Sequence, residues 1–436
     1  MLIANSQTEQ IRADLEWTWP LTGRTQWKMN SLTQVRYLDR ATPPHISTLI
    51  LLSGMAALAM NIFLPSLPKM TEHFQTDYSL MQLSVAIYLA VNAGLQLVIG
   101  PISDKLGRRT VILAGIGLFC VATLGCLVAS NIWVFLGFRM MQAVIATSMV
   151  LSRAVVRDMY PQDRSASMIG YVTMGMSVVP MIGPMIGGYL DELLGWKANF
   201  WLLLALGVAL FALAWRDLGE TAQRSGLTLR AQFAEYPELL RSPRFWGYAM
   251  AAGFSSGAFF AYVGGAPFVG SVVFGMSPST LGLFFGAPAL GYFFGNYMTA
   301  RFATRLGINR LVLWGSLCVA LGIGLAILLF AAGLGNELVF FGSMTFVGLG
   351  NGLSLPNATA GMLSVRPHLA GTASGLGGAF QIGLGAALSA LAGSLLNPAW
   401  GVWPLLLIQF STALMAIVAI LMVIRRERSL GVQPLE

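Results

Sequence analysis

The chain has 436 residues, of which 56% are apolar and only 10% are charged, and its mean hydropathy is +0.69. A soluble globular protein carries about 25% charged residues, so this composition excludes that class and indicates a membrane protein with several spans. The formal net charge is +8 at neutral pH.

Twelve apolar runs are long enough to cross a bilayer, because about 20 helical residues span its hydrocarbon core. They predict an all-α membrane protein with twelve transmembrane helices. The sixth run is short, and we expect that helix to start nearer Trp196. In chain order, the predicted spans are Ile46–Leu64, Leu80–Ile99, Thr110–Val128, Ile132–Leu151, Ala166–Leu190, Phe200–Trp215, Phe245–Val269, Ser279–Ala300, Leu311–Ala332, Leu338–Leu363, Gly371–Leu396 and Val402–Ile424.

Basic residues are strongly biased to one side of these spans. If both chain ends share a side, 23 of the 26 Lys and Arg residues fall in its loops and tails, and only Lys69 and Lys197 fall in loops of the other side. Because cytoplasmic loops are enriched in Lys and Arg, we expect both termini in the cytoplasm and the protein in the inner (plasma) membrane. Nucleic acid explains this charge poorly, since it is spread along loop edges that face anionic lipid.

A polar stretch near the middle of the chain divides the spans into two sets of six. "SDKLGRRTVILAG" before it aligns with "ATRLGINRLVLWG" after it at an offset of 200 residues. Two six-helix bundles in parallel repeat are typical of transporters that use alternating access. We therefore expect a cytoplasmic N-terminal extension (1–44), an N-terminal six-helix bundle (45–216), a cytoplasmic linker (217–243), a C-terminal six-helix bundle (244–424) and a cytoplasmic tail (425–436).

Three motifs on these spans resemble the signatures of a known family. "GPISDKLGRR" (100–109) resembles the loop signature of the major facilitator superfamily, and "FRMMQA" (138–143) resembles its span-four arginine motif. "VVPMIGPMIGG" (178–188) resembles the span-five motif of its drug:proton antiporters with twelve spans. "NIFLPSLPKM" (61–70) and "VRDMY" (156–160) are most similar to the bicyclomycin/chloramphenicol/florfenicol resistance subgroup. The resemblance implies a secondary active transporter that exports drugs or other small molecules.

The loop motif predicts a latch at the cytoplasmic face. Gly107 supplies the tight turn that a short loop needs, and we expect Arg108 or Arg109 to pair with Asp158 at the end of span four. The resemblance implies that this cluster holds the halves together in the outward-open state and that Asp104 bears on span eleven. A loop that only anchors the topology is the alternative. The latch residues are Gly100, Asp104, Gly107, Arg108, Arg109 and Asp158.

Span five combines helix breakers with small residues. Prolines bend the helix beside a face made by Gly183 and Gly187, and such faces let helices approach closely in lipid. The resemblance implies that spans five and eight meet at the boundary between the halves, where this contact would let them rock without leaking ions. Ordinary helix packing is the alternative. The motif residues are Pro180, Gly183, Pro184, Gly187 and Gly188.

Arg139 is the one charged side chain that the predicted spans place deep in the membrane. Such an arginine costs at least about 2.5–3.5 kcal/mol on insertion scales, so it is expected to face the bundle interior. The alternative is a later start of span four, with Arg139 reaching the headgroups. The other candidates are polar or aromatic residues in mid-span. The candidate substrate site is Asn61, Tyr88, Asn92, Gln96, Arg139, Gln142, Tyr262, Tyr292, Asn296 and Gln381.

Asn61 departs from the subgroup, in which the resemblance implies a proton-carrying aspartate at this position. An amide forms hydrogen bonds but carries no proton. Three explanations of coupling stay open: Asp104 or Asp158 takes the proton at the cytoplasmic mouth, the substrate carries the coupled charge opposite Arg139, or the protein is a uniporter or a variant that has lost the acid. A positive cavity without an acid favours neutral or anionic substrates over organic dications.

The sequence thus predicts a proton-coupled exporter of drugs or small metabolites. A proton-independent facilitator, a metabolite importer and a non-transporting sensor are the alternatives. The three histidines fall at span ends and the three cysteines show no disulfide or metal spacing, so we expect no enzyme activity, metal or cofactor. The expected partners are a small-molecule substrate, protons and membrane lipid, without nucleic acid, and we expect a monomer.

Overall fold

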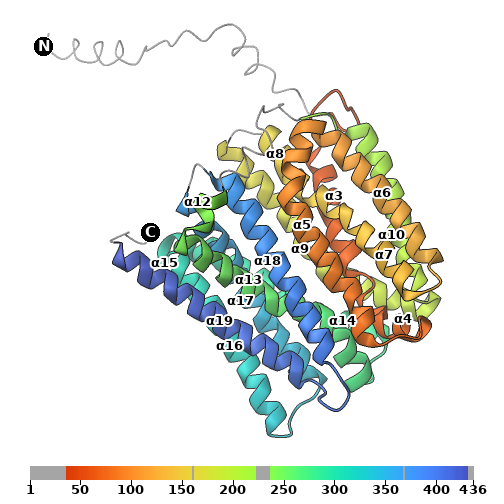
Figure 1. Cartoon of the computed structure of the whole chain (residues 1–436), viewed down its shortest axis with the longest axis vertical. Helices are drawn as coiled ribbons and strands as arrows, with labels where there is room; N and C mark the ends of the chain where they lie inside the picture. The colour runs from red at the N-terminus through yellow and green to blue at the C-terminus, as the bar shows by residue number, and fades with distance from the viewer. Residues whose placement is uncertain (1–35, 160–161, 222–235, 367–368, 431–436) are drawn as a thin grey trace, which may run out of the picture.

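All of the regular structure that can be described in this chain is helical (Figure 1). Ten helical segments are long and apolar enough to cross a membrane. The other two predicted spans are helical as well, so the twelve predicted helices are all present. The computed structural model describes residues 36–159, 162–221, 236–366 and 369–430.

The first six spans lie before the central polar stretch, and most extend several residues beyond their predicted ends. The sixth starts at Lys197, next to the Trp196 that the sequence analysis favoured. Their helices are α3 (Ile46–Asn61), η1 (Leu64–Ser66) and α4 (Leu67–His73) in span one, α5 (Tyr78–Leu106) in span two, α6 (Arg108–Val128) in span three, α7 (Ile132–Gln142), η2 (Ala143–Ile145) and α8 (Ala146–Met159) in span four, α9 (Gln162–Leu194) in span five and α10 (Lys197–Asp217) in span six.

The last six spans follow a short helix, α12 (Tyr236–Leu240). A π-helical turn extends span seven, and a turn at Gly286 interrupts span eight. Their helices are α13 (Pro243–Phe268) and η3 (Val269–Val273) in span seven, α14 (Pro278–Phe284) and α15 (Ala287–Leu306) in span eight, α16 (Ile308–Ala331) in span nine, α17 (Glu337–Val365) in span ten, α18 (Ala370–Leu395) in span eleven and α19 (Trp403–Ser429) in span twelve.

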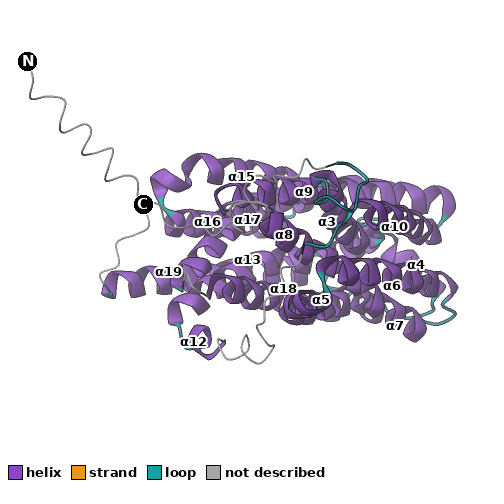
Figure 2. Cartoon of the chain, turned by 90° about the horizontal axis from the view of Figure 1, so that it is seen from above, coloured by secondary structure: helices purple, strands orange, loops and turns teal. Residues whose placement is uncertain are grey.

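The helices form two groups that lie side by side (Figure 2). Helices α3 to α10 pack on one another, and so do helices α13 to α19. Between the groups, α5 runs along α18, and α9 packs on α14. Each group is one six-helix half, and these four helices form most of the boundary.

The backbone repeats between the halves at the offset that the sequence shows. Gly107 precedes α6 with a φ of 95°, and Gly307 precedes α16 with a φ of 76°. Glycine adopts such angles without the steric cost that other residues meet. Each also donates its N–H to a carbonyl four residues earlier, on Ser103 and Ala303. The tight turn predicted at Gly107 is therefore confirmed, and it recurs in the second half.

Span four continues further toward its C-terminal end than the sequence predicts. The prediction ends at Leu151, where two nearby arginines interrupt the apolar run, but the helix ends at Met159. Buried residues such as Val155 continue the face that packs on the core of the first half. The placement of Arg153 in a loop after the span is therefore wrong, because this arginine lies inside α8.

Candidate functional site

Arg139 lies near the end of α7 and is enclosed by its own half. It is only 1% exposed. One Nη donates to Oε1 of Gln142 at 2.7 Å, and the other donates to the carbonyl of Ala59 on α3 at 2.9 Å. The rings of Phe63 and Tyr88 cover the guanidinium, with centroids 4.2 and 4.4 Å from Cζ. The Nε of Arg139 has no hydrogen-bond partner among the described residues.

A break in span one explains why Ala59 can accept this bond. Helix α3 ends at Asn61, and the carbonyls of a helix's last turn lack donors within the helix. A positive charge at this end also offsets the partial negative charge of the helix dipole. The Arg139 guanidinium therefore caps α3, and its charge is balanced in part by the dipole.

No ion pair joins Arg139 to an acid within the described residues. At the position where the subgroup implies an aspartate, Asn61 is buried and donates from its amide to the carbonyl of Ala57 at 2.7 Å. The Cβ of Asn61 lies beside Gly183 of α9. Asn61 therefore contributes to the contact between spans one and five, and no hydrogen bond connects it to Arg139.

The polar residues predicted on span two share one face of α5, as their spacing requires. Tyr88 stacks on the guanidinium, and its hydroxyl has no hydrogen-bond partner in the described structure. Gln96 donates to Asn92 at 3.3 Å and lies against Gly378 of α18. This face of α5 therefore leads from Arg139 to the boundary with the second half.

The four candidates in the second half lie on three helices, and no contact between them and the arginine is recorded in the described structure. Tyr262 is buried in an aromatic cluster, 4.8 Å from the ring of Phe285 between centroids. Asn296 donates to the carbonyl of Tyr292 on α15 at 2.8 Å, and both residues are partly buried. Gln381 is partly buried on α18. Their role in one substrate site stays a prediction.

The latch residues gather around Arg108 at the start of α6. Its Nη2 lies 2.6 Å from Asp104, its Nε lies 3.2 Å from Asp158, and its backbone N–H donates to Glu220 at 2.8 Å. Arg109 instead donates to two carbonyls beside the end of α10. The Cβ of any residue replacing Gly107 would meet the Glu220 carboxylate, which would have to move, and the positive φ of this turn favours glycine.

These recorded latch contacts all lie within the first half. The resemblance implies that Asp104 bears on span eleven, whereas the described structure pairs Asp104 with Arg108. Gly100, near the end of α5, accepts a hydrogen bond from the Ser103 hydroxyl at 2.7 Å. The cluster therefore ties spans two, three and four together in this conformation.

The glycines of span five divide between two partners. Gly183 and Gly187 face Leu58 and the Ile62 carbonyl of span one, so the expectation that this face meets span eight is wrong. The next face around α9 makes the contact between the halves. There, Gly188 lies against the carbonyl of Pro278, and the Pro184 carbonyl lies against Gly282 of α14. The spacing of four residues fits both faces, so the sequence could not assign the partner.

Comparison with known proteins identifies the family of this chain. Residues 49–382 match the family model described as Major Facilitator Superfamily. The chain belongs to the Major Facilitator Superfamily. A chloramphenicol resistance protein of Pseudomonas aeruginosa is 32% identical over 332 residues, which cover 75% of this chain and 78% of that protein. Multidrug resistance protein D of Escherichia coli is 30% identical over 352 residues, which cover 79% of this chain and 87% of that protein.

Solved structures agree with this Major Facilitator fold. A peptide transporter POT in complex with sulfate has a TM-score of 0.72 at 13% identity, over 88% of this chain and 94% of that one. A bacterial homolog of the lysosomal transporter Spinster, inward-facing and occupied, has a TM-score of 0.66 at 16% identity, over 88% of this chain and 96% of that one. With its relatives, this places the protein among multi-pass inner-membrane transporters of the superfamily's drug-resistance group.

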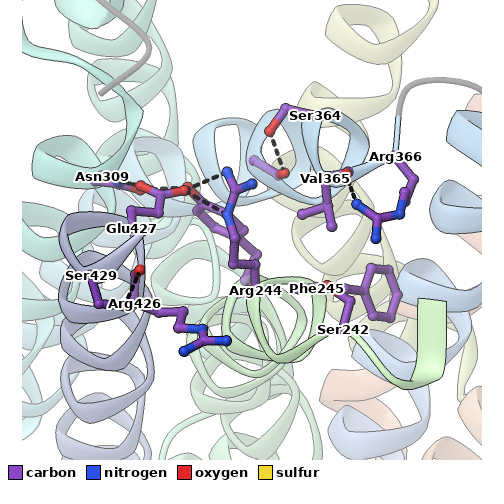
Figure 3. Close-up of polar contacts among 12 residues, drawn as sticks. Ser242, Arg244, Phe245, Asn309, Ser364, Val365, Arg366, Arg426, Glu427 and Ser429 are labelled. Atoms are coloured by element: carbon purple, nitrogen blue, oxygen red, sulfur yellow. Dashed lines mark hydrogen bonds and ion pairs between the residues drawn. The ribbon is translucent and has the colours of Figure 1, made fainter. Parts of the chain in front are cut away.

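The sequence analysis did not predict one charged cluster of this Major Facilitator chain, which lies around Glu427 (Figure 3). Glu427 is 6% exposed near the end of α19. Its Oε1 accepts hydrogen bonds from Arg244 at 2.7 Å and Tyr248 at 3.0 Å, and its Oε2 accepts one from Asn309 at 2.6 Å. The sequence places Glu427 among three arginines of the predicted tail, and only the continuation of α19 to Ser429 makes it a buried partner of spans seven and nine.

The first half buries an acid at the corresponding end of its own last helix. Asp217 is fully buried and accepts hydrogen bonds from the backbone N–H groups of Leu38 at 2.7 Å and His45 at 3.0 Å. It also accepts one from the Thr48 hydroxyl at 2.7 Å, and Thr48 and Tyr248 are separated by the 200-residue repeat. In both halves, a buried carboxylate therefore ties the first helix to the last.

Proposed function

We propose that the protein exports drugs or other small organic molecules across the inner membrane by alternating access. It works as a monomer with both termini in the cytoplasm, and the segments 45–216 and 244–424 move as two units. The observation that carries this proposal is the position of the contacts between the halves. In the described structure, the hydrogen bonds that join them all lie near one end of the spans.

These bonds come from the starts of span two and span eight and the end of span five. The Tyr78 hydroxyl donates to the carbonyl of Gly264 at 2.9 Å, and Gln82 Nε2 donates to the carbonyl of Ser389 at 2.6 Å. Glu192 accepts a hydrogen bond from the backbone N–H of Ser279 at 3.3 Å. The excess of basic residues at the opposite end makes the bonded end periplasmic. Halves that are hydrogen-bonded near one end, and not near the other among the described residues, fit one of the two states that alternating access requires.

The substrates are small organic molecules of the kind named for the relatives. The proteins most similar to this chain include ones named for resistance to chloramphenicol and bicyclomycin. Arg139 with the polar face of α5 forms the first-half side of the proposed substrate site, and Tyr292, Asn296 and Gln381 are proposed for the second-half side. Tyr262, which lies in the aromatic cluster described above, is also proposed to line the substrate site.

Proton coupling belongs to the proposal, with Asp104 or Asp158 as the proton carrier at the cytoplasmic mouth. Both acids pair with Arg108, so protonation of either would weaken the latch cluster. One observation favours a second candidate, a facilitator that needs no proton gradient. Asn61 cannot carry a proton, and the described structure pairs Arg139 with no acid.

Transport in inverted membrane vesicles tests both candidates. Radiolabelled chloramphenicol is added outside vesicles that contain the protein, with and without an imposed proton gradient. Vesicles without the protein serve as the control. Accumulation that requires the gradient supports the proton-coupled exporter. Equilibration that is independent of the gradient supports the facilitator, and uptake equal to the control contradicts both.

A further inference from the structure

We propose that the compounds this transporter exports best carry an acid group, which Arg153 receives on the cytoplasmic side and Arg139 receives at mid-membrane. This inference rests on the proposed export function and specifies the charge of its substrates. It depends on three observations: two arginines share one face of span four, the facing helices hold almost no acids, and the deeper arginine has an unused donor.

Arg139, Arg153 and Arg157 lie on one face of span four, which we call the arginine face. Fourteen helical residues separate the first two, so they point within about 40° of each other and lie about 21 Å apart along the axis. The three-residue η2 turn between them rotates the chain by about 120° per residue, which brings this angle to about 20° and keeps both arginines on one face. The arginine face therefore extends from the exposed Arg157 at the cytoplasmic end to mid-membrane.

Arg153 lies on a less buried side of α8. Leu151, Ser152 and Val155 on the other faces of α8 are fully buried in the first half, whereas Arg153 is only partly buried. Among the described residues, Arg153 has no recorded ion pair or hydrogen bond, so its donors are available to a ligand between the halves.

The helices across the boundary offer almost no carboxylate to pair with these arginines. Helices α13, α15 and α18 contain no Asp or Glu, and the one acid of α17 is Glu337, its first residue at the periplasmic end. Near the cytoplasmic end of α8, Asp104 and Asp158 both pair with Arg108. The arginine face is therefore a positive surface without its own counterions in the described structure.

The deep end of this face also lacks an anion. Arg139 is 1% exposed and its Nε has no acceptor in the described structure, while burial of a charge is costly unless it is paired. The dipole of α3 and two aromatic rings balance only part of this charge. A carboxylate on the substrate would supply the missing acceptor, because arginine forms two-point hydrogen bonds with carboxylates. Cationic compounds would meet repulsion along the whole path.

Two compounds that differ in charge test this inference on the full chain in inverted vesicles. Chloramphenicol is neutral, and chloramphenicol succinate adds one carboxylate to the same scaffold. We expect the wild type to transport the succinate faster, and Arg153→Gln to lower the ratio of succinate to chloramphenicol transport by at least about tenfold. Arg153→Lys keeps the charge and should retain part of the ratio. The control is Arg305→Gln, which removes an exposed arginine at the cytoplasmic end of α15 and should leave the ratio unchanged.

A second measurement needs no variant and covers the case in which Arg153→Gln fails to fold. In the wild type, chloramphenicol succinate should inhibit chloramphenicol transport at a concentration at least about tenfold lower than its neutral methyl ester does. Equal inhibition by chloramphenicol succinate and by its methyl ester overturns the inference. An unchanged ratio of succinate to chloramphenicol transport in Arg153→Gln overturns it as well. In either case, export of chloramphenicol would still stand. A wild type that transports neither compound contradicts the proposed function itself.

Discussion

Arg139 of the first half is buried and Arg244 of the second half is partly buried, and the two arginines differ in what surrounds them. Arg244 of the second half lies 2.7 Å from Glu427, which also accepts hydrogen bonds from Tyr248 and Asn309. Arg139 of the first half has a carbonyl, an amide and two rings around it, but no acid. The charge of Arg244 is neutralised by the acid that it pairs with. The charge of Arg139 is neutralised only when another group supplies a negative charge.

This difference suggests different uses for the two arginines. An ion pair between a buried acid and a partly buried arginine, with further hydrogen bonds to the acid, fixes the helices that carry it, here spans seven, nine and twelve. A buried arginine without an acid costs folding energy that a structural role alone does not explain, and in membrane proteins such residues face substrate or ion pathways. We therefore assign the second-half pair to stability and the first-half arginine to transport.

The largest expected effect is on folding, from Glu427→Ala. The substitution leaves Arg244 without its acid and removes an acceptor from Tyr248 and Asn309, and each buried polar group left without a hydrogen-bond partner costs about 1–3 kcal/mol. We expect a large drop in the amount of folded protein in the membrane and in its melting temperature in detergent. The double variant Arg244→Leu/Glu427→Leu removes both charges and should recover most of the loss. A single variant as stable as the wild type would contradict the structural role of the pair.

The contrast between the arginines also shows which features of the structure could be predicted from the sequence. Arg139 was identified because a charge inside an apolar run is visible in one dimension. Glu427 was missed because it follows two arginines in an apparent tail, and its burial depends on packing against spans seven and nine. The twelve spans could be predicted from apolar runs, but helix ends could not, since helices continue past the membrane wherever their apolar positions pack.

The packing partners of the span-five glycines could not be predicted from the sequence either. Gly183 and Gly188 belong to one motif, yet the first packs on span one and the second on span eight. Which face of α9 meets which neighbour depends on how the helix is rotated in the bundle. Arg153 was left outside span four because the predicted span was too short, and its place inside α8 needed the folded structure.

A smaller effect is expected at the turn that repeats between the halves. Gly107→Ala must adopt a φ near 95°, at a cost of about 1–2 kcal/mol, and its methyl group would displace the Glu220 carboxylate from the N–H of Arg108. Gly307→Ala meets the same backbone cost in the second half and serves as the matched control. We expect Gly107→Ala to lower the chloramphenicol transport rate more than Gly307→Ala does. Equal rates would show that the latch cluster has no role beyond the turn.

The smallest expected change in stability comes from Asn61→Asp, which would place an acid near Arg139 as Glu427 lies near Arg244. Asn61→Asp loses the hydrogen bond to the Ala57 carbonyl when it is ionised, a cost of about 1 kcal/mol. We expect this variant to make transport more dependent on pH and to shift its preference toward cationic compounds, measured with ethidium and chloramphenicol in vesicles at several pH values. An unchanged pH profile and substrate preference would exclude Asn61 from the transport site.

Chloramphenicol transport by Arg139→Ala in inverted vesicles, with the protein level in the membrane matched to the wild type, tests the functional assignment most directly. We predict that this variant inserts and reaches the membrane, while its transport rate falls by at least about tenfold, equivalent to 1.4 kcal/mol of lost transition-state stabilisation. A transport rate equal to that of the wild type would contradict the account, because it would show that the unpaired arginine serves only the fold.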